Sequence, residues 1–348
     1  MKFRTTFFIC LFALFSQQAY ALKVSGLYQA TVPVSDESVP KRNPAIKQAL
    51  IQVLVKLTGD RNISKSSSII PLIEQPERFV QQFRYRQATN EDNQQSRSPK
   101  LWVHFDETAL NDALRSYGLS VWGKERPSIL VWLAHEGNDS RRLVSFEENP
   151  EYLTMLDQRA SARGVSLLMP LFDLEDTSRI SVSDVWGGFK EPILDASRRY
   201  QSDVVLTGKL SQILPTLWES EWTVYIDGQA MSWTGQGELV EIVLEEAVDE
   251  LADRLATQYV NTGSTRAEVI KLLVSDVNGL DEYARALSYL ESIQSVIAVQ
   301  VKRVSIDKVM FELISHGGLN AIDQAIALGK TLELAGSSET LTYRLLPR

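Results

Sequence analysis

The sequence predicts a chain of mixed α/β and α+β folds, organised as three small domains in series. Strand-like apolar runs alternate with amphipathic helical stretches along its length, as in domains that pack helices on sheets. Its 348 residues exceed what a single domain usually contains. Hydrophobic residues make up 44% and charged residues 23%, which is the balance of an ordinary globular protein.

The first 21 residues have the three-part layout of a secretory signal peptide. Two basic residues precede an apolar run over 5–16, and Ala19 and Ala21 form the small-x-small pattern that signal peptidase needs. The apolar run is shorter than the roughly 20 residues that a transmembrane helix requires. We therefore expect cleavage after Ala21 and no integral membrane segment in the mature chain.

The cysteine content indicates the cellular compartment, and the net charge limits the classes of partner. Cleavage removes the single cysteine, Cys10, so the mature chain cannot form a disulfide. The absence of cysteine from an exported chain indicates a location in the bacterial periplasm. The full chain carries 36 Lys and Arg against 44 Asp and Glu, a formal charge of −8, which argues against nucleic acid as a partner.

The first domain is expected over residues 22–122. Periodicity and breakers predict, in order, a strand over 24–34, a helix over 44–58 capped by Asn43 with Pro44 at its first position, a helix over 73–83, a polar loop over 86–99, a strand over 101–105 and a helix over 108–117.

The second domain is expected over residues 126–262, with a mixed sheet. The predicted elements are strands over 128–134, 165–171 and 203–210, helices over 149–163, 191–200 and 238–259, an irregular stretch over 173–189, and a hairpin that turns at Asp227-Gly228. Gly164 is placed to end the first of these helices.

The third domain is expected over residues 266–348 and contains an internal repeat. Two Gly-Leu pairs, at 279–280 and 318–319, each follow a predicted strand and open a predicted helix. Two βαβ halves of this length predict a ferredoxin-like βαββαβ sandwich. Its last strand lies over either 331–335 or 340–346.

The residues assemble no catalytic constellation, so we expect a protein that is not an enzyme and needs no cofactor. The sequence has neither a Gly-x-Ser-x-Gly nucleophile elbow nor a complete phosphate-binding loop. The alternative is a carboxylate-dependent hydrolase that uses His135 with Asp173, Glu175 and Asp176. These three acidic residues are also weak candidates for a Ca²⁺ or Mg²⁺ site, but their spacing favours a solvated turn.

The tryptophans are the most informative candidates for binding. Trp218, Trp222 and Trp233 lie in or beside the predicted hairpin. Tryptophan fills cores and also anchors interfaces, so both interpretations remain open. A hairpin at a sheet edge leaves one flank unpaired, and we therefore name these three residues as candidate partner-binding residues. An open groove lined by them would instead indicate a small-ligand or glycan binder.

Four stretches resemble a known family. GLYQATVPVSDES, QALIQVLVKLTGDRN, SVWGKERPSILVWLA and ASRRYQSDVVLTGKL, between residue 26 and about 210, resemble an uncharacterised exported gammaproteobacterial family known as domain of unknown function 2066. The last stretch, a helix followed by a strand reading Asp-x-x-x-x-Gly, is also similar to the amino-terminal domain of the Tol translocation protein and to the curli secretion lipoprotein. Those proteins bind other envelope proteins.

Together these features predict a non-enzymatic periplasmic protein. We expect an interaction module or accessory factor of a cell-envelope assembly, with other envelope proteins as partners.

Overall fold

The computed structural model describes residues 24–86, 99–137, 140–260, 267–337 and 341–347. The predicted signal peptide with Ala19 and Ala21, and nearly all of the polar loop over 86–99, lie outside the described residues. In the part of the chain that is described, no helix is long and apolar enough to cross a membrane.

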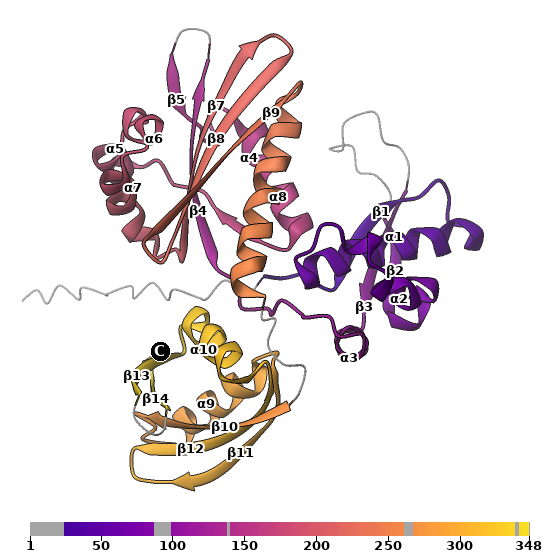
Figure 1. Cartoon of the computed structure of the whole chain (residues 1–348), viewed down its shortest axis with the longest axis vertical. Helices are drawn as coiled ribbons and strands as arrows, with labels where there is room; N and C mark the ends of the chain where they lie inside the picture. The colour runs from indigo at the N-terminus through magenta and orange to yellow at the C-terminus, as the bar shows by residue number, and fades with distance from the viewer. Residues whose placement is uncertain (1–23, 87–98, 138–139, 261–266, 338–340, 348) are drawn as a thin grey trace, which may run out of the picture.

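Three separate sheets, of three, six and five strands, organise the described chain (Figure 1). Each sheet packs helices against at least one face and has its own apolar core. This arrangement confirms the predicted mixed α/β and α+β fold class. We refer to the three parts as the N-terminal, middle and C-terminal units.

The N-terminal unit packs helices on an antiparallel sheet of order β1-β3-β2. Its elements are β1 (Gln29–Pro33), α1 (Val39–Thr58), short 3-10 helices at Ile63–Lys65, Ser67–Ile69 and Pro76–Phe79, α2 (Ile70–Glu74), β2 (Val80–Arg86), β3 (Lys100–Phe105) and α3 (Glu107–Ser116). The apolar stripe of α1, which includes Leu50, Val53 and Leu57, fills the core.

Two predictions for this unit are wrong. α1 begins at Val39 rather than beyond Asn43, so Pro44 lies inside the helix. A proline there loses one hydrogen bond to the first turn, and burial of the apolar stripe outweighs that cost. The predicted helix over 73–83 ends at Glu74, and β2 follows because it pairs with β3.

The middle unit has a mixed sheet of order β5-β4-β7-β8-β9, with β6 also paired to β4. Its elements are β4 (Ser128–Glu136), β5 (Arg141–Leu143), α4 (Pro150–Arg163), β6 (Ser166–Leu168), α5 (Leu174–Arg179), α6 (Val182–Gly187), α7 (Lys190–Ser197), a 3-10 helix at Arg198–Tyr200, β7 (Val204–Leu214), β8 (Leu217–Ile226), β9 (Gln229–Gly237) and α8 (Val240–Tyr259). Helices α4 and α8 cover one face, and α5 to α7 cover the other (Figure 1).

The stretch 173–189 is helical rather than irregular, which corrects the prediction. Asp173 caps α5 by accepting hydrogen bonds from the N–H groups of Glu175 and Asp176. Ser181 and Asp184 form a reciprocal capping box at the start of α6. Two six-residue helices are too short to show a helical period, so only their caps mark them.

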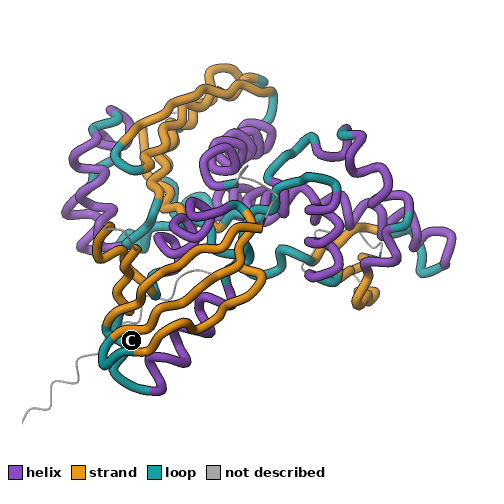
Figure 2. The backbone as a smooth tube through the Cα atoms, turned by 60° about the horizontal axis from the view of Figure 1, so that its bottom comes forward, coloured by secondary structure: helices purple, strands orange, loops and turns teal. Residues whose placement is uncertain are grey.

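The C-terminal unit packs two helices on one face of a five-stranded sheet, whose strands lie side by side in Figure 2. Its elements are β10 (Ala267–Ser275), α9 (Leu280–Ser292), β11 (Val296–Val304), β12 (Lys308–His316), α10 (Gly318–Gly329), β13 (Leu332–Ser337) and β14 (Leu341–Leu345). Both predicted Gly-Leu pairs stand where a helix begins.

The last strand of the expected ferredoxin-like pattern is replaced by a hairpin. The sheet order is β11-β12-β10-β14-β13, so both alternative positions for the final strand are occupied. β14 lies beside β10 and runs parallel to it, and β13 forms the outer edge. The predicted βαββαβ order is therefore extended by one strand.

Candidate functional site

β9 is a long edge strand whose outer side is free of strand partners among the described residues. It pairs with β8 over nine consecutive positions, from Trp218 opposite Gly237 to Ile226 opposite Gln229, without a bulge. Its nine residues, QAMSWTGQG, include no charge and no proline. Natural edge strands usually carry charged residues or proline, because the unpaired N–H and C=O groups of an edge can otherwise pair with another strand.

The other edge strands of the described chain are protected. β11 carries Lys302 and Arg303 and has two register shifts, and β13 has Glu333 and one shift. β2 carries two arginines, and β1 ends in Pro33. β5 and β6 are only three residues long. Compared with these other edge strands, the uncharged nine-residue edge of β9 is the best candidate for strand addition.

The two faces of β9 differ in chemistry. Met231 and Trp233 lie on the α8 face, opposite the core residues Val224 and Trp222 of β8. Trp233 lies under the guanidinium of Arg254, 4.9 Å from its ring centroid. Its buried indole N–H has no hydrogen-bond partner among the described residues. The opposite face carries small or polar exposed side chains, namely Ala230, Ser232, Thr234 and Gln236.

The expected partner-binding role of Trp222 is wrong, because its side chain is fully buried. Its ring occupies the space beside Gly208, where a Cβ atom would lie 2.4 Å from the ring. Trp218 and Trp233 are partly buried against the same core. Their role in binding stays a prediction, and with Trp222 in the core the three tryptophans do not form one open groove.

Trp218 belongs to an aromatic group at one end of the sheet. Its ring stacks on His135, with centroids 5.9 Å apart, and lies edge-on to Tyr152. Burial lowers the pKa of His135. The lowered pKa favours the neutral imidazole, which packs against the two rings as a structural aromatic group does.

An exposed apolar patch continues from this end of the sheet, and the sequence reading missed it. We call it the distal apolar patch; it consists of Ile213, Leu214, Leu239 and Ile242, each 51–58% exposed. Leu214 pairs with Leu217 at the β7–β8 turn, one residue before the pair formed by Trp218 and the last residue of β9. The prediction ended β7 at 210, so the exposed turn was not recognised.

One residue of the acidic turn, Asp176, is a buried anchor, whereas Asp173 and Glu175 are exposed. Asp176 is fully buried and accepts hydrogen bonds from the backbone N–H of Phe172 at 2.8 Å, from the Tyr200 hydroxyl at 2.5 Å and from Arg199 at 3.0 Å. Arg199 also binds both carboxylate oxygens of Asp173, at 2.6 and 2.8 Å. The expectation of a solvated turn is therefore wrong for Asp176.

The cation held by this turn is Arg199. Its hydrogen bonds, with those from backbone N–H groups, hold the pKa of Asp173 well below the usual range, and burial raises the pKa of Tyr200 to about 12. Glu175 lies 3.7 Å from Arg199. Within the described ranges, no group of three or more His, Cys, Asp or Glu residues is arranged to hold a metal ion.

The structure does not bring His135 together with the acidic turn. His135 contacts Tyr152 and Trp218, on the face covered by α4 and α8. Phe172, at the start of the turn, packs edge-on against Trp132 on the opposite face. The residue set named for a carboxylate-dependent hydrolase is therefore split between two faces of one sheet.

Comparison with known proteins points to an uncharacterised family. A family described as a domain of unknown function (DUF8605) matches residues 21–123. This corrects the resemblance to domain of unknown function 2066, although an uncharacterised family is what the sequence predicted. No curated protein matches the chain.

Two solved structures are similar to part of the chain. One is described as the crystal structure of lipoprotein GNA1162 from Neisseria meningitidis; it is 14% identical, and the match covers 38% of this chain and 99% of that one with a TM-score of 0.24. The other is described as an uncharacterised protein, 8% identical over 38% of this chain and 92% of that one, with a TM-score of 0.20.

Proposed function

We propose that this protein is a non-enzymatic periplasmic interaction module, and that β9 binds an extended segment of another cell-envelope protein as an added strand. The observation that carries the proposal is the unprotected nine-residue edge of β9. In strand addition, backbone hydrogen bonds supply affinity and alternate side chains supply specificity. The periplasmic location rests on the leader sequence over residues 1–21.

The faces of β9 define the chemistry of the segment that fits. On the α8 face, alternate residues of the incoming strand would meet Met231 and Trp233, which favours apolar side chains with one oxygen acceptor for the unpaired indole N–H. On the other face they would meet Ser232 and Thr234, which favours small polar residues. The distal apolar patch would extend the contact beyond the end of the strand.

A lysine on the edge tests this proposal without disturbing the fold. Thr234 is exposed and stands opposite Glu221 of β8, so Thr234→Lys places a charge on the free edge beside a compatible neighbour. Gln82→Lys, at an exposed position of the already charged β2, is the matched control. Both variants should keep the parent melting temperature, because exposed substitutions change stability by about 0.5 kcal/mol or less.

A photo-reactive residue at the exposed position of Ala230 captures the partner in intact cells. The captured partner is then identified by mass spectrometry and purified. Titration with its binding segment should show at least a tenfold weaker affinity for Thr234→Lys, about 1.4 kcal/mol, and no change for Gln82→Lys. Backbone amides of β9 should gain protection from hydrogen exchange in the complex. Equal affinity for both variants, or pairing of β9 with a second copy of this chain, would contradict the proposal.

A further inference from the structure

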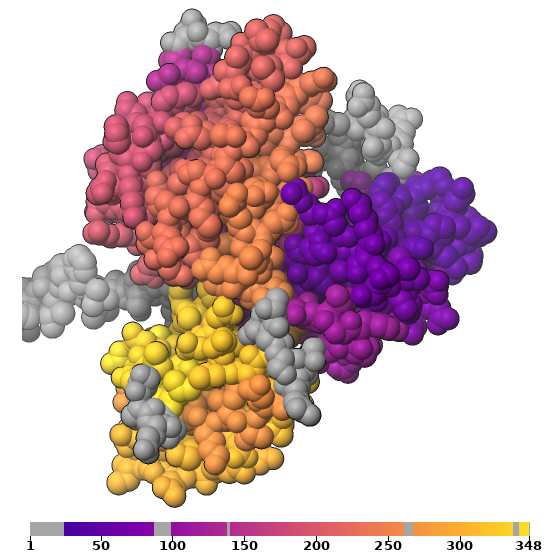
Figure 3. Space-filling model, viewed as in Figure 1, coloured from indigo at the N-terminus to yellow at the C-terminus, as the bar shows by residue number. Residues whose placement is uncertain are grey.

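A cavity lies where the three units meet. It has a volume of about 120 Å³ and is bordered by the segment between α3 and β4, the end of α8, the α9–β11 turn and α10. Figure 3 shows the lobes of the three units converging below α8, and Figure 1 shows the elements that reach this point. An engineered cavity of about 150 Å³ accepts benzene, so this one has room for a compact molecule.

Four polar atoms of cavity-lining residues are buried without a hydrogen-bond partner among the described residues. They are Trp122 Nε1, Glu125 Oε1, Gln294 Oε1 and Ser295 Oγ. The Trp122 side chain is 1% exposed, so its N–H is out of reach of bulk solvent. Buried polar groups are nearly always paired, and four unpaired ones around one cavity therefore point to a ligand that pairs them.

The surrounding contacts hold two of these groups in fixed orientations. The backbone N–H of Trp122 donates to the Leu57 carbonyl at 2.6 Å, and Arg126 lies over its ring at 4.2 Å. The amide nitrogen of Gln294 donates to the Tyr28 hydroxyl at 3.0 Å, which leaves its carbonyl oxygen for another partner. The two groups are thus positioned before any ligand arrives.

Glu125 and Gln294 converge on one point beside Gly123. A Cβ atom at Gly123 would lie 3.8 Å from Gln294 Oε1 and 3.9 Å from Glu125 Oε2. Glu125 has no ion pair within the described chain, and Arg115, a cation of the lining, is paired with Asp112 at 3.0 Å. The site therefore offers a carboxylate that has no ion-pair partner among the described residues, with an amide oxygen close by.

The chemistry of these atoms defines the ligand. A carboxylate, an amide oxygen and a hydroxyl match the three donors of a primary ammonium group, and an indole N–H needs an oxygen acceptor. The remaining lining is largely apolar, with Leu119, Ile293, Ala321, Ala325 and Leu328. We propose that the junction cavity binds a compact primary amine that also carries an oxygen, with its ammonium group held by Glu125, Gln294 and Ser295.

Three isosteric probes test the proposal on the mature full-length chain. Ethanolamine has both groups, n-propylamine lacks the oxygen and ethylene glycol lacks the ammonium. Each has so few atoms that binding no tighter than about tens of micromolar is expected, and the titrations reach millimolar concentrations. The readout is the indole N–H resonance of Trp122 in ¹⁵N-labelled protein, supported by the shift in melting temperature.

Ethanolamine should bind saturably and at least tenfold more tightly than ethylene glycol, with n-propylamine between them. Glu125→Gln should weaken ethanolamine binding at least tenfold. Glu291→Gln, at an exposed position of α9 outside the cavity lining, should leave it unchanged. Absence of saturable binding by ethanolamine, or equal binding by ethylene glycol or by Glu125→Gln, would overturn the proposal and leave water as the occupant.

Discussion

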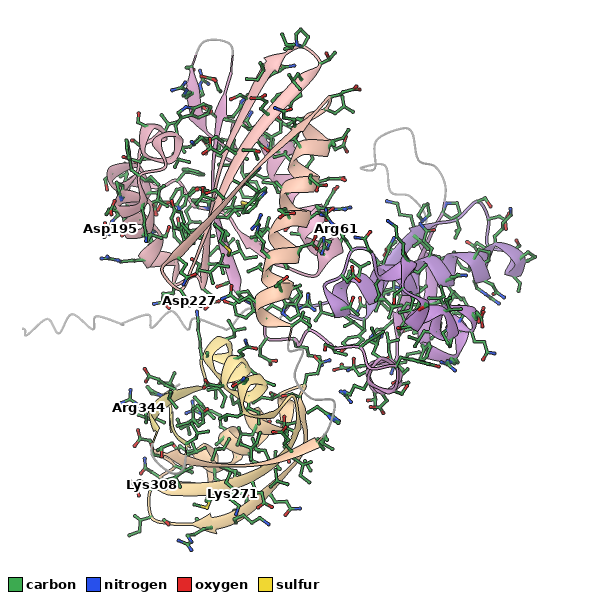
Figure 4. The ribbon with its side chains drawn as sticks, viewed as in Figure 1. Arg61, Asp195, Asp227, Lys271, Lys308 and Arg344 are labelled. Carbon is green, nitrogen blue, oxygen red and sulfur yellow. The ribbon has the colours of Figure 1, made fainter. Side chains whose placement is uncertain are left out.

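The ion cluster on α8 allows a quantitative test of what joins the N-terminal and middle units. The Asp249 side chain is 6% exposed and accepts hydrogen bonds from Arg159 and from Arg163, the latter at 3.0 Å. Arg163 is 2% exposed and also donates to the Gly59 carbonyl of the N-terminal unit at 2.7 Å. Arg61 reaches the same cluster from the N-terminal unit, on its side facing α8 (Figure 4).

Asp249→Ala should destabilise the protein by about 3 kcal/mol. Breaking a buried pair by removing one partner costs about 3–5 kcal/mol, and the lower end applies because Arg159 is one third exposed. Arg163→Met should cost less, about 1–2 kcal/mol, because Asp249 keeps Arg159 and Asp253 keeps Arg61 at 2.9 Å.

The effect of Asp249→Ala should also depend on pH. Burial alone would raise the pKa of Asp249, but the hydrogen bonds from Arg159 and Arg163 outweigh it and hold the pKa below 3.8. A carboxylate with a lowered folded-state pKa stabilises the protein above its unfolded-state pKa and loses that contribution as pH falls through the folded-state value. The difference in free energy of unfolding between the parent and Asp249→Ala should therefore be largest near neutral pH and shrink below about pH 4.

Urea unfolding, followed by tryptophan fluorescence across this pH range, measures both quantities. Glu245→Gln is the control, since Glu245 is 47% exposed and 3.8 Å from Arg159, and it should change the free energy of unfolding by less than about 0.5 kcal/mol. The reasoning fails if Arg163→Met costs as much as Asp249→Ala, or if the cost of Asp249→Ala does not change with pH.

Three further outcomes are expected. Gly208→Ala should lower stability by about 1–3 kcal/mol in a thermal melt, because its Cβ would overlap the ring of Trp222; an unchanged melt would show that the ring moves freely. Asp176→Asn should cost about 2 kcal/mol and the exposed Glu175→Gln less than about 0.5 kcal/mol, and equal costs would argue against a buried anchor. Mass spectrometry of the exported protein should find Leu22 as the first residue, and a retained leader would refute the cleavage site.

Elements with strong local signals could be predicted from the sequence. Helix α4 ends at Gly164 in a left-handed conformation, as its position after the apolar stripe indicated. The β8–β9 hairpin turns at Asp227 and Gly228, both of which have positive φ. β2 was missed because its strand conformation depends on pairing with β3, which follows beyond a polar loop and leaves no local trace.

The candidate site could be predicted only in part, because sheet order decides which tryptophan is exposed. Trp222 and Trp233 are directly opposite each other, yet β8 has a neighbour on both sides and β9 on one. The Asp-x-x-x-x-Gly pattern over residues 203–208 indicates where β7 pairs and why Trp222 is buried. Asp203 accepts hydrogen bonds from Ser128 and so holds β7 to β4, and Gly208 leaves the space that the Trp222 ring fills.

The contrast between the two edges of the middle sheet bears on how β9 is used. β5 closes one edge with three residues, two of which are arginines, so this sheet already contains an effective block to strand addition. The opposite edge is three times as long, uncharged and in regular register, and it carries an indole N–H that has no hydrogen-bond partner in the described part of the chain. A lysine at the exposed position of Thr234 would protect it at little cost to stability. A single substitution would therefore protect this edge, and its unprotected state supports the proposal that another strand pairs with β9.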